Sequence, residues 1–331
     1  MEAAIAGGAA EGGDSTVGSL GEFGLIRALA SRMPAGPGTS VGIGDDSAVV
    51  AAPSGSVVAA VDMVIEGRHF LRSLSSGRDV GIKAAARSLA DIAAMGAAPT
   101  ALLAAFAAPS SLPSSWALDL ASGLAFEAQR SGAGIAGGDT ASAESVVVTV
   151  TALGDLAGLP PVLRSGARPG DLVAVCGVLG RSAAGYALLS AGVRSPESLI
   201  AAHLRPAPPY DAGPEAARLG ATAMIDVSDG LLADLGHVAA ASGVAIDISR
   251  AQVLPDPGDP LVSLTDNGSC SRHQILNWVL TGGEDHALAA TFPPAVDLPE
   301  RWRVIGTVGP GDGVTADGQR YAGSGGWQHF R

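Results

Sequence analysis

The sequence predicts an α/β (α+β) protein with two domains. Its 331 residues are enough for about two domains of ordinary size and for a sizeable core. Helical and strand-like segments alternate through both halves of the chain, which is typical of mixed folds. Glycine and proline, with 46 and 21 residues, separate these segments and indicate frequent tight turns.

The first half of the chain begins with a predicted disordered tail over residues 1–18, which are small and polar and lack any period. Apolar spacing predicts a helix over 21–33. Two β-branched runs, 47–53 and 56–64, predict strands on either side of the turn Pro53-Ser54-Gly55. An Ala/Leu-rich stretch predicts a helix over 78–99, which Gly96 and Pro99 end.

Three further elements complete the expected N-terminal domain, residues 19–157. An apolar run at 101–109 predicts a buried strand, and an amphipathic pattern predicts a helix over 114–132. Valine and threonine dominate 146–156, which predicts another strand.

The C-terminal domain is expected over residues 158–331, after a boundary in GDLAGLPPV. A turn signal, ARPGD, leads to an apolar strand at 172–177, and a helix is expected over 181–192. The prolines of HLRPAPPYDAGP exclude one long helix there. A strand at 221–226, a helix at 228–243 and a strand in VAIDI follow. Two more strands are expected in LTGGEDHALAATFP and WRVIGTV.

The charge balance excludes several classes of partner. The chain has 32 acidic and 20 basic residues, a net charge of −12, and no cluster of lysine or arginine. Nucleic acid and membranes are therefore not expected as partners. The uncharged stretch 92–118 contains glycine and prolines that argue against a spanning helix. No signal peptide is expected either, and a cytoplasmic protein is the expectation.

Carboxylates stand at strand ends or in glycine-rich turns, in a chain where only 16% of residues are charged. They occur in GIGDD, AAVDMV, SLADIAAMGA, AGGDT, IDVSDG and TGGEDH: Asp45, Asp46, Asp62, Asp91, Asp139, Asp226, Asp229, Glu284 and Asp285. Ligand-binding groups commonly follow strand ends in α/β folds. Carboxylates that converge without basic partners stay ionised together around a divalent cation, and oxygen-only ligands favour Mg²⁺, Mn²⁺ or Ca²⁺.

Each of these carboxylates also has a structural interpretation. The pair Asp45-Asp46 suits an Asx turn, and Asp139 lies in a glycine-rich turn. Ser228 suits a helix N-cap with Asp229 in the first turn. The alternatives stay open for each motif taken alone, and the metal-binding interpretation rests on the number of such sites.

The same holds for the predicted helix over 78–99. Asp79, Lys83, Arg87 and Asp91 follow one another at i,i+4 spacing, which is also the pattern of a salt-bridged helix face. Glu284 alternatively is an exposed hairpin charge.

Two histidines and two arginines are candidate ligand contacts. His69 in EGRHF and His286 in GGEDH are either site residues or structural imidazoles. Arg164 and Arg168 in RSGARPGD either contact phosphate or lie on a surface loop.

Familiar nucleotide-binding motifs are missing from the sequence. There is no P-loop and no protein-kinase motif set. The run 132–137 matches G-x-G-x-x-G, but a predicted helix precedes it where a dinucleotide fold requires a strand. A nucleotide is therefore expected to bind through metal ions on carboxylates.

Taken in order, the motifs resemble the thiamine-monophosphate kinase family. The matching pieces run from about residue 20 to the C-terminus: GEFGLI, GIGDDSAVV, DMVIEGRHF, KAAARSLADIAAMGA, GGDT, RSGARPGD, SAAG, HLRP, IDVSDGLLADLGH and TGGEDHAL. The resemblance implies the two-domain fold of aminoimidazole ribonucleotide synthetase. In that fold an N-terminal ATP- and Mg²⁺-binding domain closes a β-barrel with its twin in a homodimer, next to a C-terminal α/β domain.

The resemblance also implies a reaction and a set of site residues. The γ-phosphate of ATP passes directly and in line to thiamine monophosphate, giving thiamine diphosphate, with several Mg²⁺ ions and no covalent nucleophile. The implied metal ligands are Asp46, Asp62, Asp91, Asp139, Asp226 and Asp229, of which Asp46 and Asp229 are catalytic. The implied ATP contacts are Asp45, Asp139, Arg164 and Ser228, and the implied substrate contacts are His69, Glu284 and Trp327.

Two departures from the family pattern affect the expected site. Ala60-Val61 precedes Asp62 where the family usually has hydroxyl residues, and His286 stands where a tyrosine is usual. Two other functions remain as alternatives. One is another ATP-using member of the superfamily, similar to the ribonucleotide synthetases or to the hydrogenase maturation factor. The other is a non-catalytic module that binds Mg²⁺-nucleotide.

Overall fold

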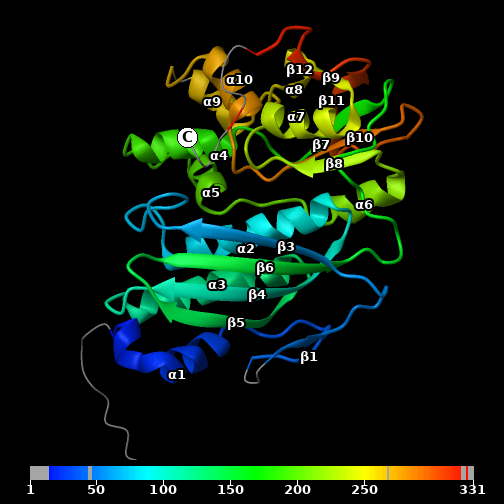
Figure 1. Cartoon of the computed structure of the whole chain (residues 1–331). Coiled ribbons are helices and arrows are strands. Elements are labelled where there is room, and N and C mark those ends of the chain that lie inside the picture. The colour runs from blue at the N-terminus through cyan, green and yellow to red at the C-terminus, as the bar shows by residue number, and fades with distance from the viewer. Residues whose placement is uncertain (1–14, 44–46, 267, 322–325, 327–331) are drawn as a thin grey trace, which may run out of the picture.

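A computed structural model of the chain describes residues 15–43, 47–266, 268–321 and 326. Its helices and strands form two layered parts, one built on each of two main sheets (Figure 1). Both parts mix helix and strand, as predicted. The predicted tail up to residue 14, Asp45, Asp46 and Trp327 lie outside the described residues.

The first sheet has four described strands in the order β3-β6-β4-β5. Their bounds are Val58–Ile65 (β3), Val147–Asp155 (β6), Ala98–Ala108 (β4) and Gly134–Ser142 (β5). Helices α2 (Gly77–Ala94) and α3 (Ser114–Arg130) lie on one face of this sheet. The other face carries no helix in the part of the chain that the structure describes (Figure 1).

Helix α2 is held close to its neighbours by glycines. A Cβ atom on Gly81 would lie 2.1 Å from the carbonyl oxygen of Leu120 on α3. A Cβ atom on Gly213 would lie 2.0 Å from the carbonyl oxygen of Ala93 on α2. Only glycine permits backbones to approach this closely. The position of α2 is therefore fixed on both sides.

The second sheet has six described strands in the order β12-β9-β11-β7-β10-β8. Their bounds are Gly313–Ala316 (β12), Ala245–Ile248 (β9), Trp302–Gly309 (β11), Leu172–Cys176 (β7), Leu288–Phe292 (β10) and Ala223–Asp226 (β8). The helices of this part are α4 (Arg181–Ser190), α5 (Glu197–Leu204), α6 (Ala212–Leu219), α7 (Leu231–Ser242), α8 (Arg250–Val253), α9 (Pro260–Asp266) and α10 (Arg272–Thr281).

One hydrophobic core joins the two parts of the chain. Ile92 and Ala93 of α2 belong to the same buried cluster as Met224 of β8 and Phe292 of β10. A second cluster, with Leu235 of α7, fills the other face of the six-stranded sheet. Helix α2 therefore lies between the two sheets, and its charged residues face the second part of the chain.

Most predicted elements are confirmed, and the differences have local causes. Helix α1 (Val17–Ala30) begins four residues before the prediction because Thr16 and Ser19 form a capping box. Strand β2 (Val49–Val50) pairs with β1 (Thr39–Val41) and not with β3, so the expected turn does not close a hairpin. Strand β5 was not predicted because glycine and alanine dominate its sequence.

Strand β1, helices α5, α6 and α8 to α10, and strand β12 were also not predicted. No helix among the described residues is long and apolar enough to cross a membrane.

Candidate active site

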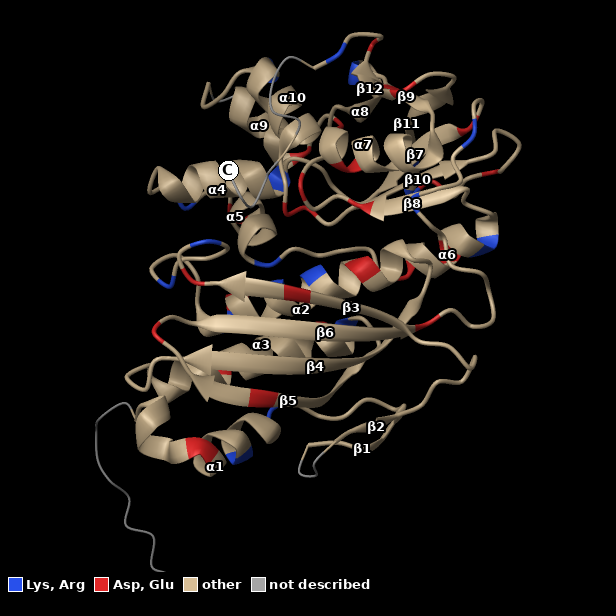
Figure 2. Ribbon diagram, in the orientation of Figure 1, with Lys and Arg blue, Asp and Glu red and all other residues tan. Residues whose placement is uncertain are grey.

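The charged face of α2 is buried and paired. Asp79, Lys83 and Arg87 are at most 8% exposed. Buried charges require partners, and each of the three has one outside α2: Asp79 pairs with Arg205 at 3.1 Å, and Lys83 and Arg87 both reach Glu284. The i,i+4 spacing indicated ion pairs along the helix, but the ion pairs of this face join it to other elements. The partners are Arg205 and Glu284 in the second part of the chain and Asp62 on β3; Figure 2 marks the charged residues along α2.

The loop before β10 brings Glu284 to this face. The backbone N–H of Glu284 donates to the carbonyl oxygen of Ser228 at 2.8 Å, which ties the loop to the β8–α7 connection. Glu284 and His286 have φ angles of 67° and 52°, a left-handed conformation that costs energy in residues other than glycine. Burial opposes ionisation of Glu284, but Lys83 and Arg87 outweigh it and lower its pKa.

Asp285, between these two residues, points away from the cavities. Its carboxylate accepts backbone N–H bonds from Gly180 at 2.6 Å and Ser182 at 2.9 Å, at the start of α4. Burial raises the pKa of Asp285 to about 7. Asp285 therefore positions the loop, and Glu284 and His286 are the residues that it presents to the site.

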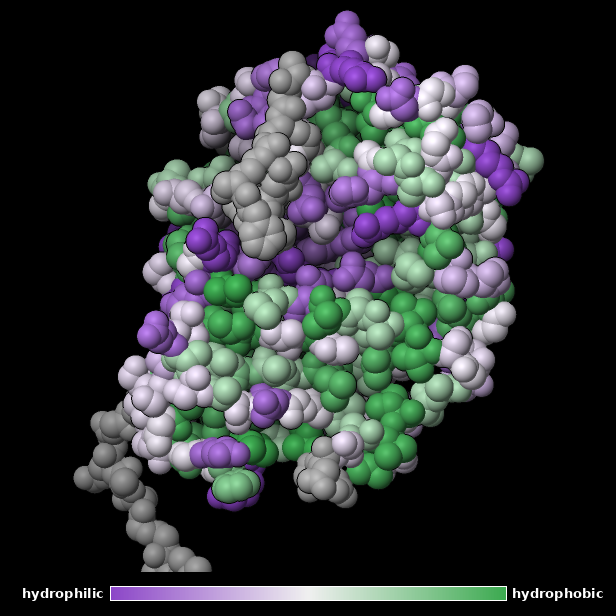
Figure 3. All heavy atoms as spheres, in the orientation of Figure 1, coloured by the Kyte–Doolittle hydropathy of each residue, from purple (hydrophilic) through white to green (hydrophobic). Residues whose placement is uncertain are grey.

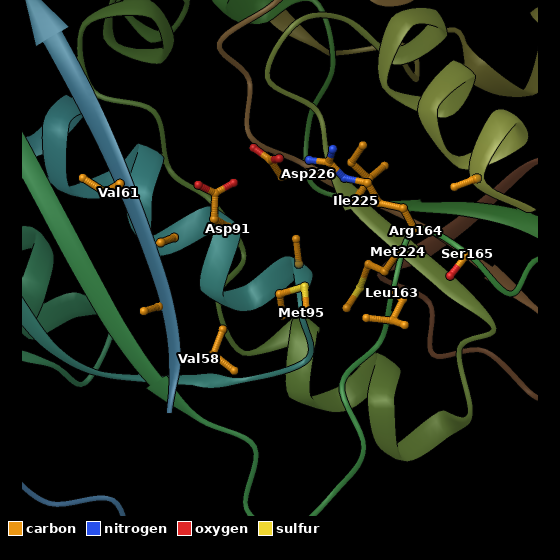
Figure 4. Close-up of a pocket in the computed structure, with 14 residues that line it drawn as sticks. Val58, Val61, Asp91, Met95, Leu163, Arg164, Ser165, Met224, Ile225 and Asp226 are labelled. Carbon is orange, nitrogen blue, oxygen red and sulfur yellow. The ribbon is translucent and has the colours of Figure 1, made fainter. Parts of the chain in front are cut away.

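Three carboxylates converge from different elements beside α2. Asp62 comes from β3, Asp91 from the last turn of α2 and Asp226 from the end of β8. Burial, followed by the charges of Asp226 and Asp62, raises the pKa of Asp91 to about 8. Figure 4 shows the side chains of Asp91, Asp226 and Arg164 turned toward one another. The site is therefore acidic and self-repelling when it is empty.

His286 supports this cluster. Its Nδ1 atom lies 3.0 Å from the carboxylate of Asp226, and its Nε2 atom is buried with no partner among the described residues. A neutral imidazole in this position donates from Nδ1 to the carboxylate. His286 therefore orients Asp226 through Nδ1. The tyrosine that is usual at this position in the family has no such nitrogen and would orient Asp226 differently.

The connection from β8 to α7 carries Ser228 and Asp229 and is held by Asp234. One oxygen of Asp234 accepts backbone N–H bonds from Ser228, Asp229 and Gly230, at 3.0, 3.1 and 3.0 Å. Burial and the charge of Asp226 raise the pKa of Asp234 to about 7. Because these donors belong to the loop, α7 begins at Leu231 and not at the predicted 228.

We expect Asp234→Ala to lower the free energy of unfolding by about 3 kcal/mol, because three buried donors lose their acceptor. Urea unfolding followed by circular dichroism measures the change. Asp234→Asn keeps an accepting oxygen and is expected to lose much less. Equal stability of the alanine variant and the wild type would contradict this role of Asp234.

Two cavities meet at the carboxylate cluster. Cavity 1, of about 560 Å³, lies between β3 and α2 on one side and the 163–165 segment and β8 on the other, and is lined by Arg164 and Ser165. Cavity 2, of about 490 Å³, contains His69, Ser228 and Glu284. Asp91 and Asp226 line both cavities. Two ligands, one in each cavity, would therefore meet at these two carboxylates.

Cavity 2 has a charged end and an apolar end. The charged residues include Asp62, Arg87 and Asp229, and the apolar wall includes Phe70, Leu71 and Tyr186. The ring of Tyr186 lies 5.2 Å from that of His203. This pattern suits a ligand with a flat ring at one end and a charged group at the other. A purple, hydrophilic band between the two parts of the molecule is visible in Figure 3.

The structure brings together most of the predicted site residues that it describes. Asp62, Asp91, Asp226, Asp229, Ser228, His69, Glu284 and Arg164 all line one of these cavities.

Asp139 is apart from the others within one chain. It lies on β5, three strands from β3, roughly 14 Å at the usual strand spacing. Its register partner is Ala105, whereas Asp62 shares a face with Val150 and Ala104, so Asp139 points to the opposite face of the sheet. A single chain therefore does not place Asp139 at the cluster.

The carboxylates fit divalent cations that retain other ligands. Mutual repulsion and burial disfavour the ionised form of Asp91, which a cation would relieve. In the described part of the chain, no three acidic, histidine or cysteine side chains are close enough to hold one ion alone. Mg²⁺ usually keeps waters and binds through one or two carboxylates together with substrate phosphates, so it does not require such a group.

Sequence reasoning missed Tyr186 and His203 as cavity residues, and nothing in the sequence indicates their position. It treated Lys83 and Arg87 as a possible salt-bridged face, because spacing along a helix does not show which element covers it.

Two family models match the chain. The model of the AIR synthase related protein, N-terminal domain, matches residues 44–156, and the model of its C-terminal domain matches residues 168–318. A thiamine-monophosphate kinase from Mycobacterium tuberculosis is 48% identical over 318 residues, which cover 95% of this chain and 93% of that protein. One from Corynebacterium glutamicum is 40% identical and covers 95% of each chain.

Solved structures agree with these matches. The structure "AaThiL complexed with AMPPCP and TMP" has a TM-score of 0.77 and 33% identity, and covers 94% of this chain and 97% of that one. A thiamine-monophosphate kinase from Stenotrophomonas maltophilia has a TM-score of 0.76 and 30% identity, and covers 89% of this chain and 95% of that one. A hydrogenase maturation protein in complex with ATP, at 18% identity and a TM-score of 0.66, shares the fold.

Proposed function

Because the chain belongs to the thiamine-monophosphate kinases of the AIR synthase related family, we propose that it phosphorylates thiamine monophosphate to thiamine diphosphate. ATP is the phosphate donor, and transfer is direct and in line. We place the reaction in the cytoplasm. The observation that carries the proposal is the pair of cavities that share Asp91 and Asp226.

Cavity 1 is the proposed position of the ATP phosphates, and cavity 2 that of thiamine monophosphate. Arg164 lines cavity 1 and points toward Asp226, which suits a phosphate contact (Figure 4). His69 and Glu284, which the family pattern assigns to the substrate, line cavity 2. The AaThiL structure, which holds a nucleotide analogue and TMP together, supports two neighbouring sites.

The reaction needs positioning and charge compensation more than covalent chemistry. The acceptor phosphate is already an anion at neutral pH, so no strong general base is required. Holding the two phosphate groups in line between the cavities converts an encounter of two anions into a step within one complex. Ser228 is the proposed ATP contact on the loop that Asp234 holds, and Asp229 of the same loop is a proposed catalytic carboxylate.

Mg²⁺ is the proposed metal, held by Asp62, Asp91, Asp226 and Asp229 with Asp46 of the GIGDD motif, while Asp45 of the same motif is a proposed ATP contact. When bound, the ions neutralise the charge of the phosphate chains. The chain's own part is to keep these carboxylates in place: α2 fixes Asp91, and His286 orients Asp226.

A homodimer is proposed from the uncovered face of the four-stranded sheet. Val61 and Met63 are 64% and 47% exposed there, and the register places Thr149 and Ala105 on the same face. Strands β3 and β5 are edges of this sheet in the described chain, and edges invite pairing. Green, hydrophobic residues dominate this face in Figure 3. A second copy would cover the face and close a barrel.

Dimerisation also gives Asp139 a function. This residue lies on the edge strand β5, whereas Asp62 of the carboxylate cluster lies on β3, the other edge strand of the sheet. In a barrel of two sheets, the β5 edge of one subunit meets the β3 edge of the other. We therefore propose that Asp139 contributes to the nucleotide and metal site of the partner subunit.

A direct assay tests the function. The protein is incubated with Mg²⁺-ATP and, separately, with thiamine monophosphate, thiamine or formylglycinamidine ribonucleotide, and ADP and products are measured. Thiamine diphosphate is expected from thiamine monophosphate alone. With ATP that is chiral at the γ-phosphorus, direct in-line transfer inverts the configuration. Folded protein that makes no thiamine diphosphate would contradict the proposal, and retention of configuration would contradict direct transfer.

A further inference from the structure

Arg87 has more hydrogen-bonding capacity than its neighbours use. It is 8% exposed and lines cavity 2. One terminal nitrogen donates to Glu284, the other lies 3.5 Å from Asp62, and Nε is buried with no partner among the described residues. A guanidinium group carries five N–H donors in a fixed plane. The donors of the two terminal nitrogens that these contacts leave unused are therefore available to a ligand in cavity 2.

Glu284 does not need Arg87 for charge compensation. Lys83 already lies 3.2 Å from the other oxygen of Glu284 and is almost fully buried. Burying Arg87 as a second cation costs desolvation energy. Its one carboxylate contact at hydrogen-bond distance, with Glu284, offsets only part of that cost. A buried cation beside a cavity, with donors to spare, indicates an anionic ligand.

The position of Arg87 on α2 defines where that anion would lie. Arg87 is four residues before Asp91, so the two side chains are neighbours on one face, about one helical turn of 5.4 Å apart. Asp91 marks the point where the two cavities meet. An anion on Arg87 would therefore be close to the place where the donor phosphate arrives.

The other end of cavity 2 suits the rest of the substrate. Tyr186 lines this cavity with its ring 5.2 Å from that of His203, and Phe70 and Leu71 also line it. Aromatic faces attract flat, positively charged rings. A cavity with an aromatic end and a cationic residue near its acidic end binds such a ring and its phosphate in one orientation only.

We infer that Arg87 binds the phosphate group of thiamine monophosphate and turns it toward Asp91, with the rings of the substrate against Tyr186. This inference rests on the proposed function and adds a specificity residue to it. Arginine suits the task because its planar group binds phosphate oxygens in pairs. The other guanidinium of cavity 2, Arg68, is exposed and remains largely hydrated.

A thermodynamic cycle tests the inference: it compares the wild type with Arg87→Met, and thiamine monophosphate with thiamine, which lacks the phosphate. Calorimetry without ATP, at one Mg²⁺ concentration, measures the dissociation constants of thiamine monophosphate and thiamine. The wild type is expected to bind the phosphate ester more tightly. Arg87→Met is expected to reduce this preference about tenfold to a hundredfold while leaving the affinity for thiamine nearly unchanged. Arg87→Lys is expected to be intermediate.

Matched variants separate this role from a structural one. Arg68→Met is expected to keep the preference, as is Arg301→Met, which removes an arginine that bridges Asp211 and Glu215 away from both cavities. Tyr186→Ala is expected to weaken the binding of thiamine monophosphate and of thiamine to the same extent.

Three results would overturn the inference or its premise. The inference is overturned if Arg87→Met still prefers thiamine monophosphate over thiamine as strongly as the wild type does. If the methionine variant does not fold, the same result in Arg87→Lys overturns it. An equal loss of affinity for thiamine monophosphate and for thiamine also overturns it. A wild-type protein that binds thiamine monophosphate but makes no thiamine diphosphate contradicts the proposed function, and the binding cycle still decides the role of Arg87.

Discussion

Asp91→Asn is expected to reduce kcat/KM for thiamine monophosphate by about a thousandfold, because it removes a proposed Mg²⁺-binding carboxylate from the point where the two cavities meet. The same change is expected to stabilise the metal-free protein above neutral pH. Folding keeps Asp91 protonated up to a pKa of about 8, whereas its ordinary value is 3.8.

The sign of this effect follows from proton binding. Between about pH 4 and pH 8 the unfolded chain releases a proton that the folded chain retains, so the stability of the wild type falls as pH rises through this window. Asparagine does not titrate and removes this contribution. In the Asp91→Asn variant, Asp234 and Asp285 still titrate, because their pKa values are both raised to about 7. The stability of the variant therefore also falls as pH rises, but by less than that of the wild type.

Urea unfolding in EDTA at pH 5, 6.5 and 8 measures the difference in the free energy of unfolding between Asp91→Asn and the wild type. Added Mg²⁺ should stabilise the wild type more than the variant. Asp234→Asn is the matched control, since Asp234 is a buried acid that lines neither cavity. It is expected to keep most of the activity. An Asp91→Asn variant that is fully active, or less stable than the wild type at pH 8, would refute this account of the site.

Thr149→Arg is expected to halve the molar mass in solution and to abolish most of the activity. Thr149 lies on the central strand β6, between Met63 and Ala105 on the uncovered face. A buried, unpaired guanidinium there would prevent a second sheet from packing. Sedimentation velocity and the kinase assay measure both effects. Phe126→Arg, on exposed α3, is the control and should remain dimeric.

A mixing experiment then tests the shared site. Asp91→Asn and Asp139→Asn are each expected to be inactive as homodimers. If Asp139 serves the partner subunit, a mixed dimer contains one site with both defects and one intact site. Unfolding and refolding an equal mixture should then restore about a quarter of the wild-type activity. No recovery from mixed dimers would show that Asp139 acts within its own chain or not at all.

The sequence predicts the elements that carry strong periodicity and most of the acidic cluster. Asp91 lies in the last turn of a long Ala/Leu helix, and Asp226 ends a short apolar strand, so the sequence pattern indicated where both residues lie. Strand β5 was not, because its glycines carry no strand propensity and its pairing with β4 determines its structure. The face on which Asp139 lies depends on that pairing, which includes a bulge between Leu102 and Leu103.

The conformation of the loop before β10 could not be predicted from the sequence either. Glu284 and Asp285 look equivalent in the sequence, but left-handed φ angles at Glu284 and His286 turn Asp285 to the start of α4. Such angles depend on contacts with Ser228 and Val227, which are distant in sequence. The roles of Arg87 and Tyr186 depend likewise on which elements cover α2 and α4.

The close contacts of α2 have a consequence for how the molecule moves. Glycine contacts fix this helix against α3 on one side and α6 on the other, and one core spans both sheets. These contacts oppose sliding or rotation of one part against the other, and we expect the two parts to unfold in one cooperative step. We therefore expect the entry of substrates and the exit of products to depend on the loops around the rims of the cavities.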